Sequence, residues 1–248
     1  MRIIVNADDL GSSRKVNAAI FALMTAGRIR SATLIPNGRA FEEAVSRTGE
    51  FPHCSFGIHL NTASGPPVGN DSALPAILGA DGCFRLEAVQ RLFVSKRVRT
   101  AVLGEWEAQL ERVRNAGVPI SHIDSHHHLH TVPALFAALK HVQRDFGVAR
   151  VRLARCGRQR RSPATVAVCL ARTVWNHALR IDGTKTTDVF CSLPEFRAIS
   201  ETKRPRFRTA EIMAHAGTKA GEEDTRLLES EWWARQMLAH EMISYNEL

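Results

Sequence analysis

Five of the eleven histidines of this chain lie in one internal run of nine residues, His122-Ile123-Asp124-Ser125-His126-His127-His128-Leu129-His130. Imidazole is a common ligand of transition metals and titrates near neutral pH. The residues from Val118 to Ile123 are typical of a short buried strand, and Pro133 fits the first turn of a helix. We therefore expect the histidines where a strand ends and a helix begins, with one or two of them as metal ligands. A polar, solvated turn is the alternative.

The rest of the chain repeats the order of strand, polar turn and helix. Short β-branched runs predict strands at Ile3–Ala7, Ala32–Pro36, Ser55–Leu60, Pro119–Ile123, Ala149–Leu153, Thr187–Ser192 and Ala210–Ala214. Helical patterns lie at Arg14–Gly27, Arg39–Thr48, Leu86–Ala116, Val132–Phe146, Pro163–Ile181 and Glu222–His240. Strands that alternate with helices predict parallel pairing through right-handed crossovers. The predicted fold class is therefore α/β, a (β/α) barrel-like fold, specifically a seven-stranded, distorted TIM-type barrel.

We expect one domain over residues 1–248, because this length suits a single large α/β domain. An open doubly wound sheet is the alternative fold. It is disfavoured as a dinucleotide-binding fold because no Gly-x-Gly-x-x-Gly follows the first predicted strand. The loop from Gly65 to Gly82 is rich in turn formers, and its length predicts a lid or a substrate loop.

The composition favours a soluble intracellular protein over a membrane-spanning or secreted one. No apolar run reaches the roughly 20 residues of a membrane-spanning helix, and the first residues resemble a core strand more than a signal peptide. The five cysteines are widely spaced, which favours reduced thiols over a disulfide framework. We therefore expect a cytoplasmic enzyme without stable insertion in a membrane.

The formal net charge is +8, and the excess arginine and lysine gather at residues 150–161 and 203–208. Nucleic acid, an anionic substrate and a membrane surface are all possible partners of such segments. Aromatic residues are scarce and no recognition motif accompanies the arginines, so we expect no nucleic acid. A merely solvated basic face is the favoured interpretation.

Polar side chains follow four of the predicted strands at their carboxyl ends. Asp8 and Asp9 follow the first strand, His59 ends the third, the histidine run follows the fourth, and His215 ends the last. Catalytic groups of (β/α) barrels come from this edge. The alternatives are a helix cap for the two aspartates, which otherwise repel each other, and hydrogen-bonded core positions for His59 and His215.

One aspartate with two histidines is an open site for a divalent metal such as zinc, manganese, iron or cobalt, whereas magnesium prefers more oxygen ligands. The metal would lower the pKa of a bound water and polarise a carbonyl. A free carboxylate could then accept the proton of the water, and a histidine could protonate a departing amine. These groups together indicate hydrolysis of an amide or an ester.

Three segments resemble the YdjC-like carbohydrate deacetylases, a family that includes chitooligosaccharide deacetylases and enzymes of hopanoid biosynthesis. They are Val5-Asn6-Ala7-Asp8-Asp9-Leu10-Gly11, Gly57-Ile58-His59-Leu60 and the histidine run. The resemblance covers nearly the whole chain and implies a barrel-like fold. It also implies metal-dependent removal of an N-acetyl group from an amino sugar.

The same resemblance implies roles for individual residues. Asp9, His59 and His126 would hold one divalent metal ion, Zn²⁺ or Mg²⁺. Asp8 would be the general base and His215 the general acid. Leu10 stands where the family motif commonly has Phe, and Ala216 stands where many relatives have Pro, a difference that bears on the assignment of His215.

The other histidines of the run allow several roles. Alternation along an extended segment would place His128 on the same side as His126, where it could bind the substrate. His130 could reach the metal if a helical turn has begun at His126. Asp124 could orient a metal-binding imidazole or bond to the backbone of the turn.

The expected partner is a small N-acetylated sugar or a glycolipid, and a homodimer is compatible with the chain. An amphipathic C-terminal helix with Trp232 and Trp233 could contact a lipid-linked substrate or pack on the barrel. The alternative function is a metallohydrolase of another amide, ester or phosphate on the same scaffold. A nucleic-acid-binding or scaffolding protein with a structural metal is disfavoured, because no cysteine lies close to the histidine run.

Overall fold

The computed structural model of this chain describes residues 1–91, 93–155, 163–201 and 207–248. Its strands are β1 (Arg2–Leu10), β2 (Ser31–Leu34), β3 (Ser55–Leu60), β4 (Ile120–Ser125), β5 (Val189–Ser192), β6 (Thr209–Ala214) and β7 (Glu241–Met242). The sheet has the order β4-β3-β2-β1-β6-β5, and the two-residue β7 adds to β1. All of these pairings are parallel, as the alternation of strands and helices predicts.

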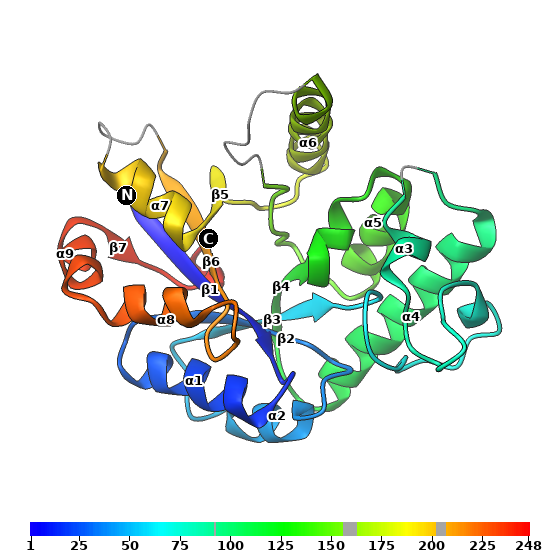
Figure 1. Ribbon diagram of the computed structural model, residues 1–248, viewed down its shortest axis with the longest axis horizontal. Helices are drawn as coiled ribbons and strands as arrows, with labels where there is room; N and C mark the ends of the chain where they lie inside the picture. The colour runs from blue at the N-terminus through cyan, green and yellow to red at the C-terminus, as the bar shows by residue number, and fades with distance from the viewer. Residues whose placement is uncertain (92, 156–162, 202–206) are drawn as a thin grey trace.

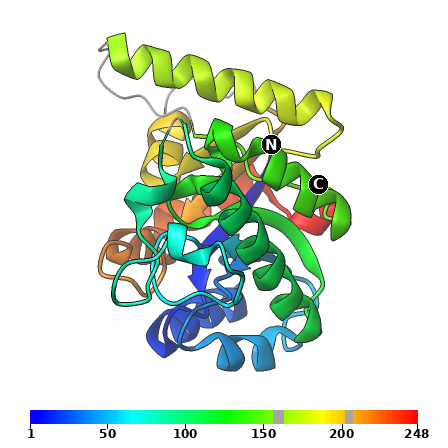
Figure 2. The same cartoon turned by 90° about the vertical axis from the view of Figure 1, so that its right-hand side faces the viewer.

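The sheet curls into a half-barrel with helices along its outer face (Figure 1). The α-helices are α1 (Arg14–Thr25), α2 (Phe41–Thr48), α3 (Leu86–Val89), α4 (Lys96–Asn115), α5 (Phe136–Asp145), α6 (Pro163–Ile181), α7 (Leu193–Glu201), α8 (Glu222–Glu229) and α9 (Glu231–Ala239). Short 3₁₀ turns are η1 (Leu74–Ala76), η2 (His126–Thr131), η3 (Pro133–Leu135) and η4 (Tyr245–Glu247). Helix α6 lies at the upper edge of the molecule in both views (Figures 1 and 2).

The closed, seven-stranded TIM-type barrel is not observed among the described residues. The segment predicted as a strand at Ala149–Leu153 makes only single parallel bridges, from Val151 to Ile123 and from Arg150 to Lys185. One bridge on each side cannot form the continuous ladder that closes a barrel. The observed architecture is therefore a parallel half-barrel of six strands, open between β4 and β5.

Serine side chains divide two of the predicted helices. The predicted helix Leu86–Ala116 breaks into α3 and α4, because the Ser95 hydroxyl accepts a hydrogen bond from the amide of Val98 and caps α4. The predicted helix Glu222–His240 breaks at Ser230, whose hydroxyl caps α9 through the amide of Trp233. Such N-caps stabilise the start of a new helix. Helix α7 was not predicted.

The core lies between the curled sheet and the outer helices. β1 is buried along almost its whole length, because it runs through the middle of the sheet. Gly57 in β3 has a particular reason to lack a side chain, since a Cβ there would lie 2.4 Å from the His122 ring. Trp233 is fully buried against Phe196, so this part of the C-terminal helix packs on the body of the protein.

Other predictions concern the basic segments, the cysteines and the membrane. Arg152 is fully buried and so does not belong to a solvated basic face, whereas residues 156–162 and 202–206 lie outside the described residues. Cys54, Cys83 and Cys191 are free thiols. Within the described parts of the chain, no helix has both the length and the apolar character needed to span a bilayer.

Candidate active site

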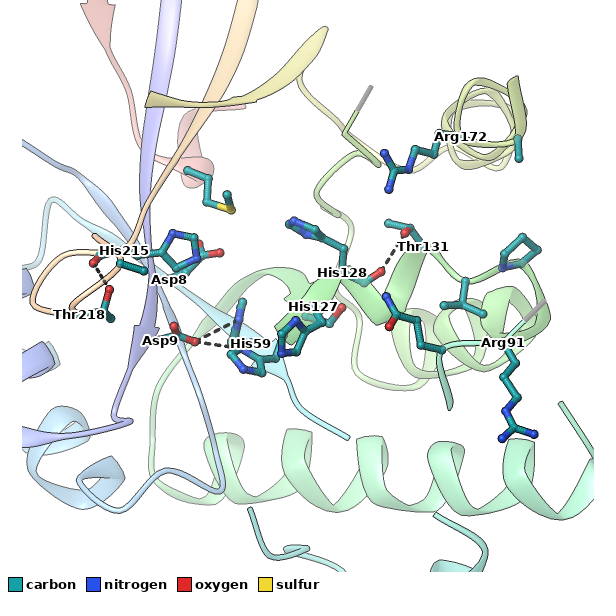
Figure 3. Close-up of a pocket in the computed structure, with 18 residues that line it drawn as sticks. Asp8, Asp9, His59, Arg91, His127, His128, Thr131, Arg172, His215 and Thr218 are labelled. Atoms are coloured by element: carbon teal, nitrogen blue, oxygen red, sulfur yellow. Dashed lines mark hydrogen bonds and ion pairs between the residues drawn. The ribbon is translucent and has the colours of Figure 1, made fainter. Parts of the chain in front are cut away.

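The carboxyl ends of β1, β3, β4 and β6 open into one cavity of about 650 Å³. The residues predicted as catalytic, metal-binding or substrate-binding all line it: Asp8, Asp9, His59, His126, His128 and His215. Figure 3 shows the His215 ring beside Asp8, with Arg172 of α6 and Arg91 on the opposite side of the cavity. The parallel sheet thus brings together residues that lie more than 200 positions apart in the chain.

Asp9, His59 and His126 form a group that suits a metal ion. Asp9 Oδ1 lies 3.4 Å from His59 Nε2 and 3.2 Å from His126 Nδ1. Despite this proximity, the buried Oδ1 atom has no aligned hydrogen-bond partner. Ligand atoms that each bind one metal ion at about 2.1 Å are about 3.0–3.4 Å apart. The spacing and the orphaned oxygen therefore fit a divalent cation better than a hydrogen-bonded cluster.

The His59 ring is fixed by Asp124, which lies directly opposite it in the β3–β4 ladder. His59 Nδ1 donates to Asp124 Oδ1 at 2.7 Å, which leaves Nε2 to face Asp9. Carboxylates hold metal-binding histidines in this way. Burial alone would lower the pKa of His59, but Asp124, Asp8 and Asp9 outweigh it and raise the pKa to about 9. The surroundings of His59 therefore favour positive charge, which a bound cation would supply.

Asp9 and Asp8 are neighbours with different partners. Asp9 adopts a left-handed backbone conformation with φ 68°, which is uncommon for a residue other than glycine. Asp8 has 1% exposure and receives hydrogen bonds from Asn6 Nδ2 at 2.9 Å and from Arg152. Burial by itself would raise the pKa of Asp8, but the Arg152 guanidinium holds it well below its usual range. Asp8 is therefore an ionised carboxylate paired with Arg152. It lies close enough to His59 and Asp124 to form a second possible group, but that group is fully buried and already held by Arg152.

Arg152 is the centre of a buried charge network. Its guanidinium contacts Asp8, Asp124 and Glu211, each at 2.6–2.7 Å. The Tyr245 hydroxyl donates to the second oxygen of Glu211. Burial raises the pKa of Glu211 to about 7, even though Arg152 acts in the opposite direction. Three carboxylates thus share one guanidinium directly beneath the cavity.

Two left-handed residues interrupt the turn that follows β4. His127 and His128 have φ angles of 53° and 56°, so the part of the histidine run after Ser125 is neither an extended strand nor a regular helix. The His128 ring lines the cavity, lies edge-on to Phe190 at 5.6 Å, and has no partner for Nδ1. Burial lowers the pKa of His128 to about 3, so its imidazole is neutral. The turn, and not the alternation of a strand, places His128 in the cavity.

His130 and His122 do not line the cavity. His130 is fully buried; its Nδ1 lies 2.6 Å from Ser125 Oγ, and its Nε2 donates to the backbone carbonyl of Arg152 at 3.1 Å. Both ring nitrogens are therefore occupied, which argues against a metal-ligand role. The His122 ring stacks on Tyr245 at 3.5 Å. Of the run, only His126 belongs to the group around Asp9.

His215 lies at the end of β6 with about a third of its side chain exposed. Its backbone amide donates to Asp224 at 3.0 Å, and its Nδ1 lies 3.9 Å from the same carboxylate. The ring can therefore contact both solvent and a bound molecule. The loop from Gly65 to Gly82, predicted as a lid or a substrate loop, does not reach the cavity in this structure. Glu105 of α4 binds the amides of Val68 and Gly69, and no residue of the loop lines the cavity.

Sequence reasoning missed the roles of Arg152, Glu211 and Tyr245. The available signal was a glutamate inside the apolar run Ala210–Ala214, since a buried glutamate requires a partner. Arg152 lies 59 residues from Glu211, and Tyr245 lies in the C-terminal turn η4. No local pattern connects these three positions.

Fold and site together define a parallel α/β half-barrel with an Asp-His-His group at the carboxyl ends of its strands. A family model described as YdjC-like protein matches residues 2–242, and the chain belongs to this family.

Relatives of known name are similar to parts of the chain or to most of it. A carbohydrate deacetylase of Brevibacillus brevis is 38% identical over 148 residues, which are 60% of this chain and 58% of the relative. One from Halalkalibacterium halodurans is 34% identical over 147 residues, or 59% and 61% of the two chains. One from Oceanobacillus iheyensis is 30% identical over 217 residues, or 88% and 86%. The match thus spans about three fifths of two of these relatives.

A solved structure from Enterococcus faecalis V583 has the same fold. It superposes with a TM-score of 0.77 at 19% identity, over 99% of this chain and 98% of that one. The protein is provisionally described as a cellobiose-phosphate cleavage protein. At this identity the likeness concerns the fold alone.

Proposed function

We propose that this protein is a metal-dependent carbohydrate N-deacetylase, a hydrolase that removes the N-acetyl group of an amino sugar. The observation that carries the proposal is the group of Asp9, His59 and His126, which lies in a cavity beside the separate carboxylate of Asp8. The relatives named carbohydrate deacetylase support the same reaction. The cavity of about 650 Å³ lies within the usual range for small-molecule sites, about 300–1,000 Å³.

Asp9, His59 and His126 would hold one divalent ion. When bound, such an ion supplies Lewis-acid polarisation of the acetyl carbonyl and lowers the pKa of water. Two imidazoles favour zinc, manganese or cobalt over magnesium. Asp124 keeps the His59 Nε2 lone pair directed at this position through the bond to Nδ1.

Asp8 is the proposed general base. It accepts the proton of the water that adds to the acetyl carbon, and it is ionised because Arg152 stabilises its charge. The same contact makes Asp8 a weak base, so the water must be acidified before the transfer. His215 is the proposed general acid, which protonates the sugar nitrogen as the carbon–nitrogen bond breaks. The products are acetate and the free amine.

His128 is the proposed substrate-binding residue. Its neutral ring lies in the cavity with Nδ1 unpaired, so it can exchange a hydrogen bond with a sugar hydroxyl. We infer that the substrate is a small N-acetylated sugar or a glycolipid.

A second candidate is a metallohydrolase that acts on another amide, an ester or a phosphate. The presence of Arg91 and Arg172 in the cavity lining favours an anionic substrate for it.

A mass-spectrometric screen tests the proposal. The metal-free protein is supplied with zinc, manganese, cobalt or magnesium and offered N-acetylated mono- and oligosaccharides, acetate esters and phosphodiesters. We expect the loss of one acetyl group from an amino sugar, abolished by a chelator and restored by metal. The Asp8→Asn variant should bind metal but turn over at least about 100-fold more slowly. Turnover of esters or phosphodiesters alone would replace the proposal with the second candidate.

A further inference from the structure

The guanidinium of Arg152 contacts three buried carboxylates, and each of them comes from a different strand. Nη1 lies 2.7 Å from Asp8 Oδ2 and 2.6 Å from Asp124 Oδ2. Nη2 lies 2.6 Å from Asp8 Oδ1, and Nε lies 2.7 Å from Glu211 Oε1. The guanidinium has no exposed surface. A planar group with several donors in fixed directions can hold its partners in one geometry, which a single ammonium cannot do.

Two of these carboxylates belong to the two halves of the site. Asp124 bonds to His59, a member of the metal-binding group, whereas Asp8 is the proposed base. A single nitrogen, Nη1, contacts both carboxylates. The position of the base relative to the metal-binding group is therefore fixed by one rigid side chain.

The far side of Arg152 is fixed by the C-terminal turn η4. The Tyr245 hydroxyl donates to Glu211, and the Tyr245 backbone amide donates to Ser55 Oγ at 3.0 Å. The Tyr245 ring is stacked on His122 of β4 at 3.5 Å, with 10° between the planes. Glu211 is thus held by both its neighbours and has no freedom to release the guanidinium.

We propose that Arg152 is a positioning residue that aligns the base Asp8 with the metal-binding face of His59, and that Glu211 and Tyr245 hold it in place. The part that concerns Asp8 rests on the proposed function, whereas the part that concerns His59 requires only metal binding. A residue that served only to balance buried charge would act equally well as lysine. The substitution Arg152→Lys therefore distinguishes positioning from charge balance, because it keeps the positive charge and removes the planar guanidinium with its several donors.

Calorimetric titration of the metal-free protein with Zn²⁺ tests the His59 part. We expect Arg152→Lys to bind Zn²⁺ at least about 10-fold more weakly than the wild type, the loss usual for partners that orient metal ligands. Arg150→Lys is the matched control. Among the described residues, the Arg150 guanidinium donates to the backbone carbonyl of Asn246 and does not line the cavity, so this variant should leave Zn²⁺ affinity unchanged. Wild-type affinity in Arg152→Lys would overturn this part.

A double-mutant cycle on acetate release at saturating Zn²⁺ tests the Asp8 part. Arg152→Lys should lower kcat at least about 10-fold with KM changed less than about twofold. In the Asp8→Asn background the same substitution should lower kcat by less than about twofold, because the base on which it acts is already absent. Equal losses in both backgrounds would overturn the positioning of Asp8.

Two further outcomes are informative. If Arg152→Lys does not fold, Tyr245→Phe takes its place, because it removes one hydroxyl and keeps the stack on His122. Smaller losses of Zn²⁺ affinity and kcat then support the proposal, and wild-type values contradict it. If the wild type binds Zn²⁺ but releases no acetate, the proposed function fails, while the Zn²⁺ titration still decides the relation of Arg152 to His59.

Discussion

His59 and Asp124 are paired across the β3–β4 ladder, and their side chains meet at 2.7 Å. The pairing keeps a proton on Nδ1, because an ionised carboxylate can only accept a hydrogen bond. The other nitrogen is thereby directed at Asp9 before any ligand arrives. The backbone register of two strands thus determines the chemical state of a side chain in the cavity.

The substitution Asp124→Asn should weaken metal binding by about 10- to 100-fold, because an amide can present its donor to His59 and reverse the tautomer. Competition with a chelating dye measures this affinity. Asp182→Asn is the control, since Asp182 is exposed and pairs with Lys140 outside the cavity. Equal affinities in Asp124→Asn and the wild type would show that the pairing does not orient His59.

The histidines of the run should have two different roles: His126 should bind metal, whereas His130 should only stabilise the fold. His126→Ala should abolish stoichiometric metal binding, because it removes one of the three members of the group. His130→Ala should keep the stoichiometry but lower the free energy of unfolding by about 1–3 kcal/mol, since Ser125 and the Arg152 carbonyl lose a buried partner. Metal analysis and urea unfolding measure the two quantities. A His130→Ala protein that lacks metal would place His130 among the ligands.

Glu211 should make the protein less stable as the pH rises. Burial raises its folded-state pKa to about 7 from an ordinary value of 4.5. The protonated acid is therefore favoured in the fold, and its contribution is present below about pH 4.5 and is lost as the pH rises through about 7.

The Glu211→Gln variant does not titrate at this position, so its stability relative to the wild type should rise between pH 5 and 8. The full change is on the order of 3 kcal/mol. Thermal or urea unfolding of the metal-free protein at each pH measures the difference. Glu231→Gln on the exposed start of α9 should show no such trend. A flat difference for Glu211→Gln would mean that Glu211 stays ionised beside Arg152.

Gly57 should not tolerate a side chain. A Cβ at this position would lie 2.4 Å from the His122 ring, which is itself held against Tyr245. Gly57→Ala should lower the free energy of unfolding by about 1–3 kcal/mol or more, as overpacking of a core usually does. Gly49→Ala is the control, because nothing lies within 4 Å of its added Cβ. Urea unfolding that finds the two variants equal would show that His122 can move aside at no cost.

The carboxyl ends of the strands were the most predictable feature of this protein. The meeting of Asp8, Asp9, His59, the histidine run and His215 at one edge could be predicted from the order of strands, because parallel strands end at one edge. The choice of Asp9, His59 and His126 as one set came only from the resemblance to the family. The predicted closure of the barrel is not confirmed among the described residues, since β propensity in Ala149–Leu153 says nothing about whether each neighbour continues the ladder. The backbone angles of His127 and His128 were equally out of reach, because tertiary contacts impose them.

The buried charge network around Arg152 could not be predicted from the sequence either. Arg152 was grouped with the surface arginines because its nearest neighbours in sequence are basic. Its partners Asp8, Asp124 and Glu211 come from strands far apart in the chain and converge only when the sheet curls. The basic neighbours of Arg152 in sequence therefore predicted an exposed position for a residue that is buried and forms three ion pairs in the site.

The left-handed backbone at Asp9 has a consequence for how this protein could be redesigned. Asp8 still follows the strand and points at Arg152, whereas the chain has turned at Asp9 and its carboxylate reaches the histidines. Deleting one residue within β1 would move Asp9 into the position of Asp8 and Leu10 into the position of Asp9, so the two histidines would lose their carboxylate.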